Sequence, residues 1–327
     1  KNGAHASGCI CYTTSPIHNL ESYVKLAKDM EGMGVGSICI KDMAGIMGPQ
    51  EAYDLVKALK ETVKLPIVVH THCTTGLGPV TLQKAVEAGA DVVDTAISSF
   101  SGGTSQPATE TMAYIFRQEG YEVGLNDKVL KEINDFFKPI KAGYLEDKTL
   151  NPRVMGTETD ALVYQVPGGM LSNLVAQLTA QKSLDRLDEV LNEVPAVRKD
   201  LGYPPLVTPM SQMVGVQATA NVLAGERYKN VSKEIKAYVR GEYGKAPGEI
   251  DPALVKKILG DEKPITCRFA DTLKPGFEEG KKEIGSLAKS DEDVLSYIAF
   301  PAQAEAFFQK RAEKEKNTFS YTIKEIK

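Results

Sequence analysis

Two histidines stand two residues apart at the end of an apolar run, in the segment VVHTHCTTGLG (68–78). Alternate side chains of an extended strand share one face, so His70 and His72 are expected to point the same way. Two imidazoles in that arrangement can ligate one divalent ion through their ring nitrogens. The alternative is that both are hydrogen-bonded polar residues near a strand end, and the motif alone leaves the choice open.

A lysine closes a second apolar run, GVGSICI (34–40). One interpretation is that Lys41 extends its ammonium group from the strand end into water. A lysine held away from water can instead act as a base, form a Schiff base or take up CO2 to become an anionic carbamate. The neighbouring Asp42 either folds back on the turn that follows or takes part in the site.

A third polar segment is GGTSQPATE (102–110). Its glycines predict a turn into a helix that Thr104 or Ser105 caps. The free amides of a helix N-terminus also offer an anion site beside a hydroxyl donor. Asp94 and Thr95, a little earlier in the chain, are expected to be hydrogen-bonding residues at a strand end.

These segments are spaced by a repeating pattern of strands and helices. Parallel βαβ units are predicted. The polar segments follow the carboxyl ends of their strands, so these segments are expected to lie together at one edge of the sheet. A complete (β/α)8 barrel needs eight such units, so four units form half a barrel or a small open sheet. Strands are expected at 7–16, 34–40, 65–72 and 90–99, and helices at 19–33, 49–63, 79–89 and 108–120.

Beyond Lys138 the sequence changes character. A loop-rich bridge is expected at 138–169, and helical sequence follows it. The predicted domains are residues 1–137, with four βα units, and residues 138–327, which are mostly helical. The helices expected in the second domain cover 170–183, 184–201, 209–224, 231–240, 251–260, 275–284, 291–299 and 302–315.

The composition argues against several classes of protein. Of the 327 residues, 42% are hydrophobic and 25% are charged, as in globular chains with a buried core. A net charge of −4, with lysines mixed among glutamates, argues against binding to nucleic acid. Five irregularly spaced cysteines indicate reduced thiols rather than a disulfide or zinc-ribbon framework. No apolar run approaches the ~20 residues of a membrane span, and no signal-peptide pattern is present.

Several motifs, taken in order, resemble the carboxyltransferase domain of biotin-dependent enzymes. This family includes the α subunit of oxaloacetate decarboxylase, the B subunit of two-subunit pyruvate carboxylase and the 5S subunit of transcarboxylase. The resemblance implies an α/β fold, with the C-terminal half of a TIM (β/α)8 barrel followed by a mostly helical domain. The motifs are IKDMAG, HTHCTTG, AVEAGADVVDTAIS, TSQPATE, GGMLSNL, TPMSQMVGVQA, GERYK and GEYGKAPG.

The family's first-strand motif, which contains a metal-binding aspartate, is absent here. The chain is therefore expected to be an N-terminally truncated fragment that is inactive and poorly soluble alone. Half a barrel leaves two strand edges unpaired, which native folds avoid.

The resemblance also implies a set of site residues. A divalent metal (Zn, Co or Mn) is held by carbamylated Lys41, by His70 and by His72, together with the missing aspartate. Thr104 falls on the threonine that moves a proton between biotin and the enol of pyruvate, so Thr104 and Lys41 are the expected catalytic residues. The residues expected to bind substrate or biotin are Ser105, Gln106, Ser211 and Gln212.

The implied reaction is carboxyl transfer between oxaloacetate or pyruvate and biotin on a separate carrier domain. In it the metal acts as a Lewis acid on the keto oxygen. The SQM sequence at 211–213 favours the α subunit of a sodium-pumping oxaloacetate decarboxylase. Three alternatives stay open: the B subunit of pyruvate carboxylase in the carboxylating direction, a metal-dependent aldolase or acyl-CoA lyase barrel, and a non-catalytic scaffold that docks a biotin carrier.

The expected partners follow from the same resemblance. They are a biotin carrier, pyruvate and oxaloacetate, further copies of the chain, and either membrane-bound β and γ decarboxylase subunits or a biotin carboxylase subunit. The expected location is the cytoplasm, or the inner face of the membrane through partner subunits. No nucleic-acid partner is expected.

Overall fold

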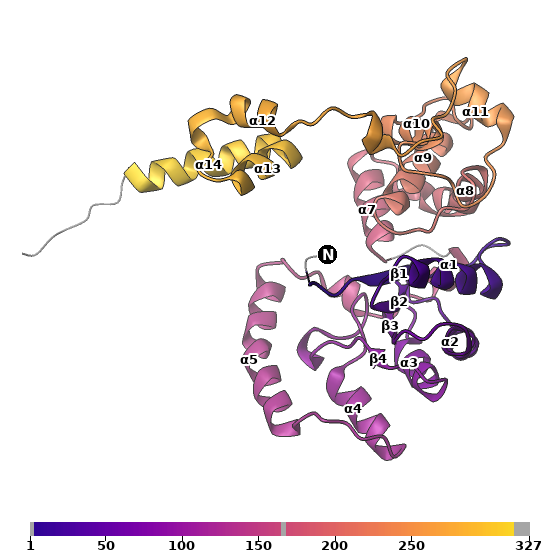
Figure 1. The fold of residues 1–327 in the computed structure, drawn as a ribbon, viewed down its shortest axis with the longest axis vertical. Coiled ribbons are helices and arrows are strands. Elements are labelled where there is room, and N and C mark those ends of the chain that lie inside the picture. Colours follow the sequence, from indigo (N-terminus) through magenta and orange to yellow (C-terminus); the bar gives the residue numbers. More distant parts are fainter. Residues whose placement is uncertain (1–2, 165–167, 317–327) are drawn as a thin grey trace, which may run out of the picture. The chain divides into compact units, whose positions relative to one another are not determined.

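The computed structural model describes residues 3–164 and 168–316. The chain divides into two compact units, the first ending at Thr266 and the second beginning at Cys267. Among these described residues, the first unit holds the sheet and the helices α1 to α11, and the second holds α12 to α14 (Figure 1).

The first unit opens with a four-stranded parallel sheet in the order β1-β2-β3-β4 (Figure 1). The strands are β1 (Ser7–Cys11), β2 (Ser37–Asp42), β3 (Ile67–Thr71) and β4 (Val92–Val93). All four predicted strands are confirmed, but the first ends at Cys11 rather than at residue 16, and the fourth is much shorter than the expected 90–99. Beyond β4 the ladder becomes irregular: Asp94 still donates its amide to the carbonyl of Val69, whereas Ala96 bridges to Ala108.

Helices alternate with these strands, as predicted. Asn19 caps the first by accepting the amide of Ser22 at 2.9 Å, and Pro49 occupies the first turn of the second. The four helices are α1 (Leu20–Gly32), α2 (Pro49–Thr62), α3 (Gly78–Glu87) and α4 (Thr109–Gln118).

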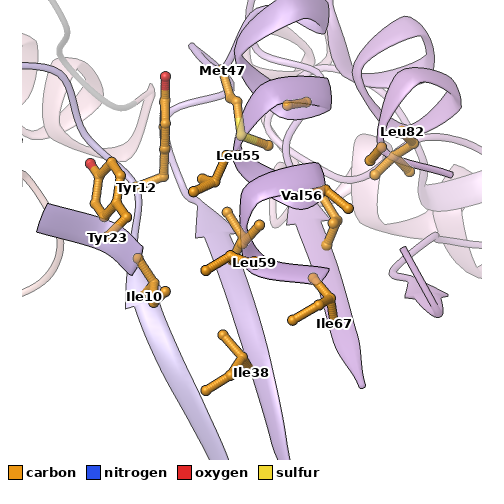
Figure 2. Packing of buried hydrophobic residues seen from close by; sticks show 14 of the residues in the cluster. Ile10, Tyr12, Tyr23, Ile38, Met47, Leu55, Val56, Leu59, Ile67 and Leu82 are labelled. Atoms are coloured by element: carbon orange, nitrogen blue, oxygen red, sulfur yellow. The ribbon is translucent and has the colours of Figure 1, made fainter. Parts of the chain in front are cut away.

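The helices and the sheet share one hydrophobic core, on one face of the sheet. Burial of each large aliphatic side chain contributes about 1.5–3 kcal/mol, so this core is the main source of stability for the sheet. A parallel sheet with its helices on one face is the arrangement of a (β/α)8 barrel, whose other face lines the barrel interior. The buried core includes Ile10, Ile38, Ile67, Leu55, Val56, Leu59 and Leu82 (Figure 2).

A helix of 20 residues, α5 (Asp127–Glu146), contradicts the loop expected at 138–146. Pro139 lies inside this helix, and prolines usually end helices because they lack a backbone donor. Asn126 caps the helix by accepting two backbone amides of its first turn. The helix runs across the predicted domain boundary at 137/138, and that boundary stays a prediction.

The rest of the first unit is helical. These helices enclose a second hydrophobic core, separate from that of the sheet. On α8, buried Arg198 donates to the hydroxyl of Thr13 at 2.8 Å and to the carbonyl of Pro204 at 3.1 Å. The helices are α6 (Asp160–Tyr164), α7 (Gly168–Ala180), α8 (Leu187–Asp200), α9 (Met210–Ala224), α10 (Lys233–Arg240) and α11 (Pro252–Leu259).

The second unit is a small helical bundle. Ile284, Val294 and Phe308 form its core, and Arg311 donates to both carboxylate oxygens of Asp293 at 3.1 and 2.7 Å. In the described parts of both units, no helix is long and apolar enough to cross a membrane. The three helices, all expected from the sequence, are α12 (Phe277–Ile284), α13 (Asp291–Ala299) and α14 (Pro301–Lys316).

Candidate metal centre

The strand register places Lys41 beside His70. The two residues are direct partners in the parallel pairing of β2 and β3, so their side chains project from the same face of the sheet. His72 follows just past the end of β3. All three side chains are partly buried. The structure thus brings together the three residues predicted to meet at the carboxyl ends of the strands.

The two imidazole rings approach each other through their Nε2 atoms, which are 3.1 Å apart. Nδ1 of His70 donates to the carboxylate of Asp94 at 2.8 Å, and Nδ1 of His72 donates to the carbonyl oxygen of Thr104 at 2.6 Å. Both partners are acceptors, so each neutral ring carries its hydrogen on Nδ1 and a lone pair on Nε2. Two lone pairs therefore face the same small volume, which requires a cation or a hydrogen-bond donor.

This separation fits two ligands of one metal ion. Metal–imidazole bonds are ~2.0–2.1 Å long, so two ring nitrogens on one ion lie roughly 2.9–3.4 Å apart. Metal-ligating histidines commonly donate their other ring hydrogen to a carboxylate or a carbonyl, as both rings do here. Burial lowers the pKa of His72, so this ring stays neutral and keeps its lone pair at neutral pH.

Two imidazoles do not complete a coordination shell. Within residues 3–164 and 168–316, no group of three or more His, Cys, Asp or Glu side chains is placed to hold a metal ion. The Lys41 ammonium forms no hydrogen bond or ion pair with any side chain in those same ranges. Further donors must therefore come from other residue types, or from outside the described residues.

Asp42 has a structural role, which settles the choice that the sequence left open. Its carboxylate accepts the amides of Ile46 and Met47 at 3.0 and 2.9 Å, and the hydroxyl of Thr71 at 2.8 Å. The side chain is fully buried, and burial raises the pKa of this carboxyl. These bonds tie the turn after β2 to β3, and so fix the backbone next to Lys41.

Asp94 is a site residue that sequence reasoning did not single out. It was expected to form hydrogen bonds at a strand end, and its partner is the Nδ1–H of His70. The sequence feature that could have identified Asp94 is its position just after β4, because β4 is the neighbour of β3, which carries His70. Thr95 has the simpler role that was expected, because its hydroxyl bonds to that of Thr109 at 2.9 Å.

Replacing Asp94 should weaken metal binding without removing it. In Asp94→Ala the ring of His70 loses the bond that fixes its orientation, and residues of this kind contribute about tenfold to a hundredfold in metal affinity. Asp94→Asn keeps an acceptor oxygen and should lose less. Calorimetric titration with Zn²⁺ measures the metal affinity of both variants, and exposed Asp29→Ala is the control. Equal affinities for Asp94→Ala and the parent would show that His70 does not need this bond.

The loop before α4 carries the other residues predicted near this site. Thr104 contributes its carbonyl to His72, whereas Ser105 donates its hydroxyl to Oε1 of Gln106 at 3.2 Å. Nε2 of Gln106 lies 3.3 Å from Nε2 of each histidine. Gly103 has φ +53°, and a side chain there would collide with the backbone at Val154, so only glycine fits this turn.

The predicted cap of the following helix was wrong. α4 begins at Thr109, and neither Thr104 nor Ser105 caps it; the residue before the helix is Ala108, which has no capping side chain. The two hydroxyl residues belong instead to the tight turn that brings Gln106 to the histidines.

Ser211 and Gln212 lie in another part of the first unit, on the first turn of α9. Together with Asn173 and Gln177 of α7 they line a pocket of about 300 Å³. Among the described residues, no hydrogen bond joins Ser211 or Gln212 to the two histidines. Their role in binding substrate or biotin stays a prediction.

Two family models match the chain. One, described as HMGL-like, covers residues 4–137, and the other, described as the conserved carboxylase domain, covers residues 161–325. The B subunit of pyruvate carboxylase from Methanocaldococcus jannaschii is 53% identical over 312 residues, which are 94% of this chain and 55% of that protein. The methylmalonyl-CoA carboxyltransferase 5S subunit of Propionibacterium freudenreichii is 48% identical over 322 residues, which are 96% of this chain and 62% of that protein.

A solved structure shows the same fold. The carboxyl transferase domain from Rhizobium etli pyruvate carboxylase, with pyruvate, has a TM-score of 0.85 at 28% identity, over 94% of this chain and 55% of that chain. This chain thus spans between about half and two thirds of the length of these three proteins. The α/β fold expected from the sequence, a TIM-barrel-type parallel sheet followed by a helical part, is confirmed. From its motifs, its fold and these matches, the chain belongs to the carboxyltransferase family of biotin-dependent enzymes.

Proposed function

We propose that the full-length protein is an enzyme that transfers a carboxyl group from a biotin carrier to pyruvate. The observation that carries this proposal is the approach of the two Nε2 lone pairs of His70 and His72 to 3.1 Å at the strand ends. His70 and His72 would hold a divalent metal there, which would supply a Lewis acid for a keto oxygen and for the charge of an enolate. Carboxyl transfer to and from pyruvate needs that stabilisation, because both directions share the enolate.

The relatives favour the carboxylating alternative over the oxaloacetate decarboxylase α subunit that the SQM sequence had favoured. The relative at 53% identity is named as the B subunit of a pyruvate carboxylase, and the one at 48% is a carboxyltransferase subunit. Neither supports the expected membrane subunits or sodium transport. These carboxylase relatives also make the aldolase or lyase barrel and the non-catalytic scaffold weaker candidates. The proposed partners are therefore a biotin carrier and a biotin carboxylase subunit.

Each residue of the site has a distinct task in this proposal. His70 and His72 hold the metal, and Lys41 as a carbamate supplies the anionic oxygen that two neutral rings lack. Asp94 keeps the ring of His70 in the tautomer that binds metal. The hydroxyl of Thr104 carries the proton between biotin and the enol. Substrate or biotin contacts are assigned to Ser105, Gln106, Ser211 and Gln212.

The reverse half-reaction tests the proposal without partner subunits. The full-length protein is incubated with oxaloacetate and free biotin, and the pyruvate formed is measured by coupling to lactate dehydrogenase. We expect pyruvate release that depends on biotin and is lost in His70→Ala. A rate that does not respond to biotin, or that survives in His70→Ala, would contradict the proposal.

A further inference from the structure

The backbone of Thr104 is held by a hydrogen bond on each side. Its amide donates to the carbonyl of Val154 at 2.9 Å, and its carbonyl accepts the Nδ1–H of His72 at 2.6 Å. The hydroxyl of Thr104, by contrast, forms no hydrogen bond with any residue in the described ranges. The main chain is thus fixed, while the group assigned to proton transfer stays free to give and take a hydrogen.

Val154 belongs to a segment that we call the strap, residues 152–158, which follows α5. The strap forms backbone hydrogen bonds with two loops at the carboxyl ends of the strands. Val154 accepts the amide of Thr104, in the loop between β4 and α4, and Glu158 donates its amide to the carbonyl of Thr74, just after β3, at 2.7 Å. The strap therefore connects the loop that carries the two histidines with the loop that carries Thr104.

Gly103 determines how closely the strap can approach. A Cβ atom at this position would lie 2.7 Å from both Cα and the carbonyl carbon of Met155. That is well inside the roughly 3.5–4.0 Å of a normal carbon–carbon contact. Because the opposing atoms belong to the backbone, no side-chain rotation relieves the collision. A side chain at Gly103 would therefore separate the strap from the turn, next to the amide of Thr104.

The neighbouring Gly102 provides a direct comparison. Gly102 and Gly103 both have positive φ, +84° and +53°, so a side chain at either position strains the turn. A Cβ atom at Gly102, however, would meet no other described residue within 4 Å, apart from its neighbours in the chain. Only at Gly103 would a side chain also displace the strap.

We propose that Gly103 is a positioning residue for the proton transfer at Thr104. Without a side chain at Gly103, the strap can hold the amide of Thr104, and this bond fixes the place of the Thr104 hydroxyl relative to His72. The inference rests on the proposed function and deepens it, by naming what orients the proton carrier. Gly103 carries no reacting group and acts through Thr104. A misplacement of about 1 Å in a reacting group can cost roughly a hundredfold in rate.

The test measures biotin-dependent pyruvate release from oxaloacetate by the full-length protein, per bound metal ion. Gly103→Ala should lower kcat about a hundredfold. Gly102→Ala is the matched control, because it strains the same turn without displacing the strap, and its kcat should stay close to that of the parent. Adding Gly103→Ala to Thr104→Ala should cost almost nothing further, since the group that Gly103 positions is already absent.

Three results would overturn the inference while leaving the proposed function intact. They are the parent's kcat in Gly103→Ala, equal losses in Gly103→Ala and Gly102→Ala, and a full further loss when Gly103→Ala is added to Thr104→Ala. If the parent's rate does not respond to biotin, the proposed function fails together with the inference.

Thermal unfolding shows whether each variant is folded. If Gly103→Ala does not fold, Glu158→Pro replaces it in the comparison, because it removes the amide that the strap donates to Thr74. Its kcat should also fall, and this loss should disappear in the Thr104→Ala background. An unchanged kcat in folded Glu158→Pro would show that the strap does not position Thr104.

Discussion

His70→Ala and His72→Ala are each expected to abolish tight metal binding by the full-length protein. Each change removes one of the two lone pairs that face each other across 3.1 Å. The loss should exceed the roughly hundredfold effect of a residue that only orients a ligand. Metal content after dialysis, together with calorimetric titration of Zn²⁺ or Mn²⁺, measures it. Carboxyl transfer should fall with the metal, because the Lewis acid is then missing.

The control for this experiment is another histidine of the same chain. His5 is exposed and bonds to the hydroxyl of Ser37 at 3.0 Å, so His5→Gln should leave metal affinity unchanged. Thermal unfolding of each variant shows whether the fold survives. Folded His70→Ala protein that binds metal as tightly as the parent would show that the imidazole pair is not the metal site.

The second large effect is expected at Lys41. In the proposal its carbamate is the anionic ligand, and a carbamate exists only while CO2 is available. Lys41→Ala should therefore remove metal and activity, and bicarbonate-free buffer should weaken metal binding by the parent. Lys41→Glu supplies a permanent carboxylate, so its metal affinity should not depend on CO2. Titration with and without bicarbonate compares these proteins.

Exposed Lys28→Ala on α1 is the matched control, and it should follow the CO2 dependence of the parent. The register pairing of residues 41 and 70 is the reason to expect a direct effect of Lys41 on the histidines. Full metal affinity and activity in Lys41→Ala, or equal affinity of the parent with and without CO2, would rule out the carbamate.

Much of the fold follows from local sequence signals. The alternation of strands and helices, the cap at Asn19 and the proline at the start of α2 are short-range features, and the structure confirms them. The common face of His70 and His72 follows from the period of two of an extended strand. Predicting that Lys41 lies beside His70 also required the inference that the neighbouring strands pair in parallel.

Features that depend on distant contacts were missed. The bond between Asp94 and His70 joins residues 24 apart, and the contacts of Gln106 with the rings join residues 34 and 36 apart. No local sequence pattern predicts contacts between residues so far apart along the chain. α5 was missed for the opposite reason, because Pro139 is a strong local signal that the rest of the helix overrides. The preference for a decarboxylase rested on three residues, too few to separate enzymes that share the whole fold.

X-ray absorption at the metal edge of the loaded full-length protein tests the central claim most directly. The account predicts two imidazole nitrogens at about 2.0–2.1 Å from the metal, and the loss of their scattering in the doubly substituted protein with His70→Ala and His72→Ala. A spectrum without imidazole scattering, or one that the double substitution leaves unchanged, would contradict it.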